Sequence, residues 1–443
     1  MPAPMSRREL IAWLAAATGA TATGVAVFGD GRQPSSAASQ RPVGSSGRQP
    51  TEAGSDSEDV RAPTAGASSD GPPLLVVIEM PGGNDGLSTV VPYGLGQYYD
   101  LRSQTAIAAG DVLTLDDEIG LHPALTHLHE RGVTVVEGIG SFEPDGSHFE
   151  MLARWWAGAS TRSSMSAVAD TGWLGRVADL LDDGSTPATV ISIGSGAHPI
   201  VRSRAAGTVS LRGASDIDAV VGADSEDEYR STFQAALRQL GEQAEGASGT
   251  DMLSALRGSI AETLTFAERL GGQPEQAESS YPSSGLGESL RFATSVFAAD
   301  AGVRVVHVSM DGDFDTHEGH SWKHPNLMAD LDESLAAFDD DLRRRGLSNR
   351  VLTMTTSEFG RTARENDSGG LDHGTASTAL LIGPKSGSRL GAAPSLGRFD
   401  DNNDLVATVA FESYLGGVVE GWLGIPASEV FGTGTEPLDL QLT

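Results

Sequence analysis

The stretch LLVVIEMPGGNDG at residues 74–86 places a nearly continuous apolar run directly before a glycine-rich turn. An apolar run of this length without alternation indicates a strand covered on both faces, as in the parallel sheets of α/β proteins. Asn, Asp and Gly tolerate the backbone angles of tight turns, so the strand is expected to end near Met80. Similar apolar runs follow at 133–139, 188–193, 303–309, 351–356 and 378–383.

Helical patterns lie between these runs, and the clearest covers residues 325–345. Apolar residues recur there every three or four positions, Pro325 suits the first turn, and Gly346 suits the helix end. Strands that alternate with helices predict an α/β fold with a doubly wound, mostly parallel sheet over residues 74–443. Residues 222–285 interrupt the alternation, and we interpret them as a helical insertion or cap, or equally as an ordinary pair of packing helices.

Residues 1–29 resemble a twin-arginine (Tat) export signal. Arg7 and Arg8 precede an uncharged, mildly apolar run that ends at Phe28. We therefore expect an exported, extracytoplasmic protein of the cell envelope or a secreted one, and an uncleaved run would act as an N-terminal membrane anchor. Residues 30–73 are rich in Ser, Gly, Pro and Ala, with few large apolar residues, so they are predicted to form a disordered linker.

The composition excludes some classes of partner and of chemistry. The 443 residues carry 60 acidic and 30 basic side chains, a net charge of −30, which argues against nucleic acid and anionic membranes as partners. There is no cysteine, so neither disulfides nor thiol chemistry contributes.

Polar motifs follow the predicted strands, and in α/β sheets ligands collect outside the carboxyl ends of the strands. Because parallel strands end at one edge of a sheet, we expect these loops to meet in a single site. The motifs are PGGNDG at 81–86, GSFEPDGSHFE at 140–150, DGDFDTHEGHSWKH at 311–324, SEFGRT at 357–362 and GGLDHGT at 369–375.

Asp85 in the first motif suits a ligand for a hard metal or a polar group, although the turn alone also explains it. The motif lacks the lysine and the spacing of a phosphate-binding loop, so nucleotide binding is discounted. Ser147 in the second motif could act as a nucleophile activated by a metal or by a base, and His148 is its neighbour. Capping of the following helix is the favoured role for Ser147.

Carboxylates and histidines are dense in the third motif, a combination that suits zinc, manganese or iron better than calcium. His317 is favoured over His320 and His324 because it lies closest to the strand end. The last two motifs supply further candidates. Arg361 could hold an anionic group bidentately, or pair with Glu358 in a structural ion pair.

The order of these motifs resembles the domain-of-unknown-function 1501 family, whose bacterial members commonly carry Tat signals. Besides GGNDG, GSHFE, SEFGRT and DHGT, the chain has LHPAL at 121–125, TGWLGR at 171–176 and FDTH at 314–317. The resemblance runs from about Leu74 to Leu423 and is weakest in residues 222–285. It implies membership of the alkaline phosphatase and sulfatase-like superfamily, and hence a doubly wound α/β fold.

The resemblance also implies hydrolysis of phosphate, sulfate or related esters at one or two divalent metals, such as zinc, manganese or calcium. Asp85 is similar in position to the first metal ligand of that superfamily, Ser147 to its nucleophile, and His373 to its final histidine. Glu358 stands where an Asp-His pair is expected, which implies a one-metal or altered site. The implied catalytic residues are Ser147, His148 and Arg361, and the implied metal ligands are Asp85, Asp315, His317, Glu358, Asp372 and His373.

We therefore expect an exported metal-dependent hydrolase whose substrate is a small anionic ester. The alternative is a non-catalytic binding or assembly protein that contacts a component of the cell envelope and keeps a degenerate site. A third interpretation is a carbohydrate-active hydrolase, which would need two carboxyl groups roughly 5–10 Å apart.

Overall fold

The computed structural model describes residues 26–28, 71–161, 170–194, 196–221, 228–242, 252–271 and 280–442 of the chain. The predicted export signal and disordered linker lie outside these residues, apart from 26–28 and 71–73. Within the described residues, no helix is both long enough and apolar enough to cross a membrane.

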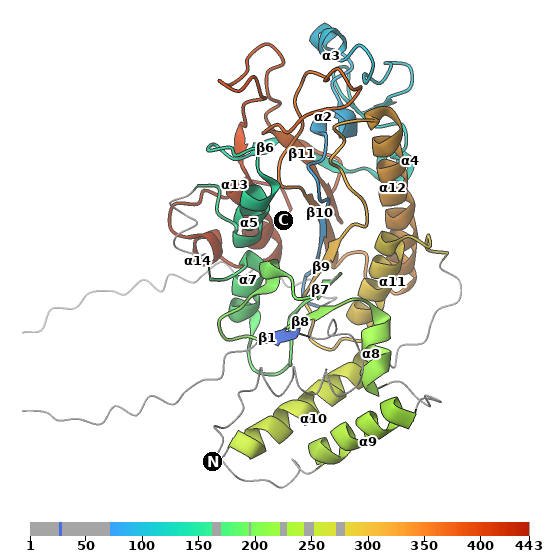
Figure 1. Ribbon diagram of the computed structural model, residues 1–443, viewed down its shortest axis with the longest axis vertical. Helices are drawn as coiled ribbons and strands as arrows, with labels where there is room; N and C mark the ends of the chain where they lie inside the picture. The colour runs from blue at the N-terminus through green and yellow to red at the C-terminus, as the bar shows by residue number, and fades with distance from the viewer. Residues whose placement is uncertain are drawn as a thin grey trace, which may run out of the picture.

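In the described part of the chain, the central element is a ten-stranded mixed sheet (Figure 1). All six predicted strands belong to it, and neighbouring strands are parallel except in the pairs made by β1 and β11. A mostly parallel sheet with helices on both faces confirms the predicted doubly wound fold. In spatial order the strands are β1 (Ala26–Phe28), β8 (Thr208–Leu211), β7 (Val190–Ile193), β9 (Val305–Ser309), β2 (Leu74–Glu79), β10 (Val351–Thr356), β11 (Ser377–Ile382), β6 (Thr134–Gly140) and β12 (Arg389–Gly391), with β13 (Val409–Ala410) also beside β6.

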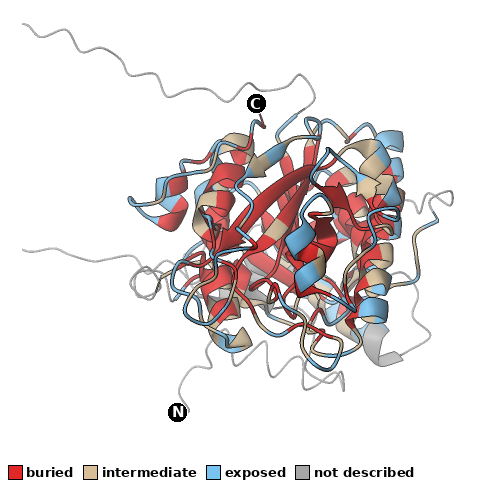
Figure 2. Ribbon diagram, turned by 90° about the horizontal axis from the view of Figure 1, so that it is seen from above, coloured by how far each residue is buried: buried red, intermediate tan, exposed pale blue. Residues whose placement is uncertain are grey.

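Two layers of helices cover the sheet because its strands are apolar on both faces. Along β2, Leu74, Val76 and Ile78 belong to one core, whereas Leu75 and Val77 belong to the other. Figure 2 shows the strands buried between helices whose outer faces are exposed. The first layer is α4 (Thr126–Arg131), α11 (Gly285–Ala298) and α12 (His320–Arg344), and the second is α5 (His148–Ala157), α7 (Trp173–Leu181), α13 (Phe411–Val418) and α14 (Ala427–Phe431).

Helix α12 begins five residues before the start predicted at Pro325. The reason is tertiary: the His320 ring is buried, with Nδ1 2.9 Å from Thr316 Oγ1 and Nε2 3.0 Å from Ser88 Oγ. Gly319 precedes the helix with a φ of 65°, which glycine adopts without steric cost. Pro325 therefore lies in the second turn, where it removes one backbone hydrogen bond.

A small second sheet and two short helices lie beyond the carboxyl edge of the main sheet (Figure 1). Leu87, Tyr98 and Leu405 belong to the third core, which these elements enclose. The elements are α2 (Gly86–Thr89), β3 (Val90–Val91), α3 (Gly96–Leu101), β4 (Leu113–Thr114) and β5 (Gly120–Leu121).

The region predicted as a helical insertion contains α9 (Glu228–Glu242) and α10 (Met252–Gly271). These helices adjoin α8 (Ala214–Val221) at the end of the molecule away from α2 and α3 (Figure 1). Phe266 and Leu270 of α10 are buried in the first core. The described helices of this region therefore do not cover the carboxyl edge of the sheet.

The carboxyl edge of the sheet gathers the predicted motifs. Four strands run in the same direction: β2, β6, β9 and β10. The loops that follow them therefore leave the sheet at one edge, and these loops cover residues 80–85, 141–147, 310–319 and 357–362. β11 runs in the opposite direction and begins at this edge, which brings residues 369–375 to the same place. One antiparallel strand thus adds the fifth motif to the site.

Candidate metal centre

Three histidines and one aspartate converge at the carboxyl edge. Nε2 of His373 lies 3.0 Å from Nε2 of His148 and 2.9 Å from Nε2 of His317. Oδ1 of Asp315 lies 3.2 Å from Nε2 of His373 and 3.1 Å from Nε2 of His317. Neighbouring ligands of a tetrahedral metal with bonds of about 2.0–2.1 Å stand roughly 3.3 Å apart, close to these separations. We call these four residues the histidine cluster.

Two carboxylates lie on the outer side of the histidine cluster. Nδ1 of His148 is 2.9 Å from Oε1 of Glu358, and Nδ1 of His317 is 2.8 Å from Oδ1 of Asp372. A carboxylate oxygen accepts a hydrogen bond, so each Nδ1 donates, and Nε2 of each neutral ring carries a lone pair. The sequence predicts Glu358 and Asp372 to be ligands, but both carboxylates lie outside the histidine cluster, where they orient the rings of His148 and His317.

The backbone anchors His373 in the same way. Its Nδ1 lies 2.8 Å from the carbonyl oxygen of Gly146 and donates to it, so in the neutral ring Nε2 carries the lone pair. His148, Asp315 and His373 thus bring their ligand atoms together as a group that could hold a metal ion, and His317 adjoins this group through His373 and Asp315. Lone pairs and a carboxylate this close together are unfavourable without a cation between them. A metal ion or a proton can supply that charge. The hydrogen bond with Glu358 raises the pKa of His148, which favours a bridging proton when no metal is bound.

The donor set of the histidine cluster suits a transition metal. Three imidazole nitrogens and one carboxylate suit zinc, manganese or iron, whereas calcium takes oxygen ligands. The side chains of His148, Asp315 and His373 are 28%, 29% and 25% exposed, so solvent reaches the cluster. Catalytic zinc sites keep such an open side for water or substrate.

Arg361 holds the aspartate of the cluster. Its Nη2 lies 2.5 Å from Oδ1 of Asp315 and also donates to the backbone oxygen of Gly82. Its other two nitrogens donate to the backbone oxygens of Gly83 and Leu371, at 2.9 and 3.1 Å. Burial raises the pKa of Asp315, but the hydrogen bond and charge of Arg361 bring it below its usual value. Arg361 is buried with all three nitrogens engaged, so it positions Asp315 and the glycine turn, which differs from the predicted binding of an anionic group.

The apolar ring of Phe359 packs against two rings of the histidine cluster. Its ring centroid lies 4.8 Å from those of His148 and His373, and the side chain is buried. Phe359 therefore contributes packing and no ligand atom on this side of the cluster.

Asp85 lies in a separate buried network. Arg102 binds both of its carboxylate oxygens, with Nη1 2.5 Å from Oδ2 and Nη2 2.9 Å from Oδ1. The backbone N–H of Leu87 donates to Oδ1, so Asp85 also caps α2. Burial raises the pKa of Asp85, but Arg102 holds it well below the usual range. The structure thus pairs Asp85 with an arginine and does not bring it into the histidine cluster, contrary to the predicted metal set.

Ser147 occupies the N-cap position of α5, but its side chain makes no capping hydrogen bond. Its backbone N–H instead donates to Oδ1 of Asp145, at 2.9 Å. The side-chain cap favoured from the sequence is therefore wrong.

Acidification is expected to destabilise the protein through three buried histidines and the partly buried His198. Burial lowers the pKa of His122 and His320 to about 4 and that of His198 to about 3, and it holds the pKa of His324 well below its usual value. The unfolded chain, with histidine pKa values of about 6.5, binds more protons than the folded chain below that pH, so stability falls as the pH drops from about 6.5 to 4. Each pKa unit is worth about 1.4 kcal/mol, so we expect several kcal/mol to be lost between pH 7 and pH 4.

Urea unfolding at pH 7, 5.5 and 4, with a chelator present to remove any contribution from a bound metal, measures this loss. A free energy of unfolding that stays constant over this range would contradict the neutral state of the four histidines.

The model of the family described as "Protein of unknown function (DUF1501)" matches residues 73–412. The chain belongs to this family. Among curated proteins, no sequence matches it.

Solved structures similar to this DUF1501 chain are remote from it. The PsFucS1 sulfatase from Pseudoalteromonas sp. is 12% identical with a TM-score of 0.35, over 73% of this chain and 65% of that one. The C-terminal periplasmic domain of EcEptC from Escherichia coli, solved in complex with zinc, is 10% identical with a TM-score of 0.32, over 71% and 74%. The alkaline phosphatase of the Antarctic bacterium TAB5 is 13% identical with a TM-score of 0.28, over 71% and 93%. Similarity at this level concerns the general fold and gives no information about activity.

The DUF1501 chain has a second group of potential ligands, Glu79, His198 and His307, which no motif of the sequence indicates. Oε2 of Glu79 lies 2.9 Å from Nε2 of His307 and 3.4 Å from Nε2 of His198. The indole N–H of Trp156 donates a hydrogen bond to the same carboxylate. Nδ1 of His198 accepts a hydrogen bond from the backbone N–H of Ile200, so its Nε2 carries the proton. A ring protonated at Nε2 offers no lone pair there, so this group stabilises a buried Glu79 anion and is a poor metal site.

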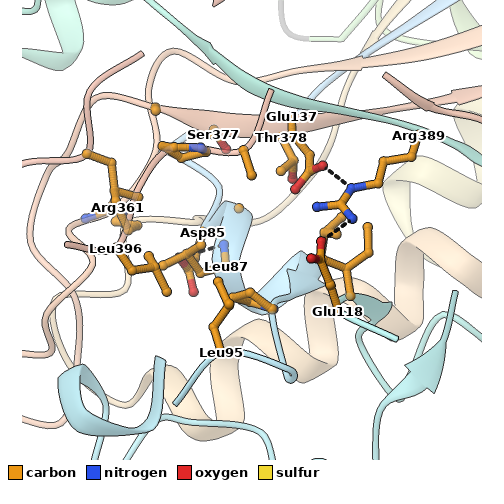
Figure 3. Close-up of a pocket in the computed structure, with 18 residues that line it drawn as sticks. Asp85, Leu87, Leu95, Glu118, Glu137, Arg361, Ser377, Thr378, Arg389 and Leu396 are labelled. Atoms are coloured by element: carbon orange, nitrogen blue, oxygen red, sulfur yellow. Dashed lines mark hydrogen bonds and ion pairs between the residues drawn. The ribbon is translucent and has the colours of Figure 1, made fainter. Parts of the chain in front are cut away.

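A pocket of about 550 Å³, including its open mouth, is lined by residues of α2 and β11 (Figure 3). Its walls are largely apolar. Arg389 lies at one end of the pocket and forms ion pairs with Glu137 and Glu118. Asp85 and Arg361 are the two predicted site residues among its lining, and no member of the histidine cluster lines it. The pocket is therefore distinct from the candidate metal centre.

Proposed function

We propose that this protein is an exported, metal-dependent hydrolase of phosphate or sulfate esters. The histidine cluster carries the proposal, because three Nε2 lone pairs are fixed by hydrogen bonds at Nδ1 and face one carboxylate. The residues that would hold the metal are His148, Asp315, His317 and His373. A zinc ion bound there would supply a Lewis acid that polarises an ester oxygen and stabilises its developing negative charge.

The residues around the cluster suit this role. Glu358 and Asp372 accept hydrogen bonds from the Nδ1 atoms of His148 and His317, so Nε2 of each neutral ring carries the lone pair that a metal would use. Phe359 keeps water from the inner side and strengthens electrostatic interactions there. The outer side is open, so an ester can approach from solvent. Export through the Tat pathway, proposed from the paired arginines, would deliver a protein that folds and takes up its metal before translocation.

Metal content and ester turnover, measured on one preparation, test the proposal. Full-length exported protein, purified without chelators, is subjected to elemental analysis and assayed with aryl phosphates and aryl sulfates. We expect about one transition-metal ion per chain, and turnover that a chelator removes and added metal restores. A protein that holds no metal and turns over no ester would refute the proposal and favour a non-catalytic envelope protein.

Ser147→Ala is expected to lower ester turnover at least about 100-fold while the bound metal stays unchanged. Ser147 directly precedes the proposed ligand His148, and its hydroxyl is not used as a helix cap, so it is our proposed nucleophile. Steady-state rates and metal content are compared with those of Ser185→Ala, a control on an exposed turn. Wild-type turnover in Ser147→Ala would instead indicate direct attack by water.

A further inference from the structure

The two carboxylates that orient rings of the histidine cluster differ in burial. Glu358 is buried, and the backbone N–H of Gly82 donates to its Oε1 at 2.7 Å. The Asp372 side chain is 57% exposed, and its partner His317 is 43% exposed. An exposed pair of this kind contributes little unless its geometry is held, because both side chains lose freedom when they meet. Asp372 therefore needs a further contact to fix the ring of His317.

The side chain of Asn366 makes that contact. Its Nδ2 lies 3.0 Å from Oδ1 of Asp372, the same oxygen that lies 2.8 Å from Nδ1 of His317. Nδ2 also lies 2.9 Å from the backbone oxygen of His317. One amide group thus binds both the carboxylate and the main chain of the histidine that the carboxylate orients.

The orientation of the Asn366 amide follows from its partners. Its oxygen lies 2.9 Å from the backbone nitrogen of Ser368 and 3.0 Å from that of Gly370, and both N–H groups donate to it. The two partners of Nδ2 are both acceptors. Both hydrogens and both lone pairs of the amide are therefore used, and a flipped amide would lose all four hydrogen bonds.

The segment that carries Asn366 packs directly on the loop that carries His317. The backbone N–H of Leu371 donates to the backbone oxygen of Thr316 at 3.0 Å. A Cβ added to Gly370 would collide with the backbone oxygen of His317, so the two segments are in close contact. Asn366 is thus held at a fixed place relative to His317.

We propose that Asn366 is a positioning residue of the metal centre, which fixes the Asp372 carboxylate and, through it, the ring of His317. The inference rests on the metal site of the proposed function and is independent of which ester is hydrolysed. Without the amide, Asp372 could turn towards solvent, and Nδ1 of His317 would lose the partner that sets the direction of Nε2. Asn366 lies between the motifs at 357–362 and 369–375 and belongs to neither.

Zinc titrations of the full-length protein, by competition with a chromophoric chelator, test the role of Asn366. We expect Asn366→Ala to weaken zinc binding roughly three- to tenfold, as for the loss of one or two hydrogen bonds. Asp372→Ala is expected to weaken it roughly 10–100-fold, as for an outer partner of a ligand. In the Asp372→Ala background, Asn366→Ala should change the affinity by less than about twofold, because both residues act through one network. Asn402→Ala, which alters an exposed asparagine of another loop, should bind zinc like the wild type.

The coupling between the two substitutions separates positioning from a purely structural role, because a structural role would weaken zinc binding equally in both backgrounds. Circular dichroism checks that each variant folds. If Asn366→Ala does not fold, Asn366→Asp takes its place in the same cycle. Its Oδ1 can still accept from Ser368 and Gly370, but its second oxygen cannot donate to Asp372, so we expect weaker zinc binding there as well.

The outcomes separate the role of Asn366 from the proposed function. If the wild type binds zinc and the Asn366 variant binds it equally tightly, or if the effects of the two substitutions add, the positioning role is overturned and the metal centre stands. If the wild type binds no zinc, the metal centre and the positioning role are both refuted. Coupled effects on zinc affinity without turnover of any ester support the positioning role and refute the hydrolase.

Discussion

Replacing His373 with alanine is expected to abolish metal binding at the carboxyl edge. Nε2 of His373 lies within 3.2 Å of each of the other three members of the histidine cluster, so this ring is the central member of the proposed metal site. Its loss removes one of four donors and the contact that links the others. We expect the affinity for zinc to fall by more than the roughly 10–100-fold typical of an outer hydrogen-bond partner. Elemental analysis and competition with a chromophoric chelator measure the change.

His129→Ala provides the matched control for this variant. His129 is also a partly exposed histidine bonded to a backbone oxygen, with its Nε2 2.9 Å from the carbonyl oxygen of Thr114. It lies outside the cluster, so we expect wild-type metal content. Circular dichroism checks that both variants fold. If folded His373→Ala binds zinc as tightly as the wild type, the cluster is held together by a proton and is not a metal site.

The location of the site follows from the sequence because strand direction controls where loops emerge. The apolar runs identify the strands, and parallel strands release their loops at one edge. Asp315, His317 and His373, which are more than fifty residues apart at the extremes, meet there as predicted. The antiparallel strand β11 begins at the edge where its neighbours end, so the loop before it reaches the same site.

The role of each residue within the loops does not follow from the sequence, because it depends on which atom faces which. Asp85 looks like a ligand, yet Arg102, 17 residues further along the chain, binds both of its oxygens. A sequence pattern cannot distinguish a candidate metal ligand from a residue such as Asp372, which lies 2.8 Å from Nδ1 of His317. Glu79 and His307 were visible only as polar residues within apolar strands, and the hydrogen bonds that define their role are tertiary.

Replacing Arg102 with methionine is expected to cause the largest loss of stability, about 3–5 kcal/mol. Arg102 and Asp85 are both buried, so the substitution leaves an unpaired carboxylate in the protein interior. It also removes hydrogen-bond donors from the backbone oxygens of Ala363 and Thr362, at 2.9 and 3.0 Å. Breaking a buried pair costs far more than breaking an exposed one because the remaining charge cannot be solvated. Urea unfolding at pH 7 measures the free energy of unfolding.

Arg343→Met is the matched control, because its ion pair with Asp340 has the same 2.5 Å separation as the Arg102–Asp85 pair but is exposed on both sides. We expect a change within the error of the measurement, since exposed pairs contribute little. Adding Asp85→Asn to Arg102→Met should restore part of the lost stability by removing the unpaired charge. Equal, small effects of Arg102→Met and Arg343→Met would show that burial does not govern the strength of the Asp85 ion pair. A loss that Asp85→Asn leaves unchanged would assign the effect to the backbone contacts of Arg102 alone.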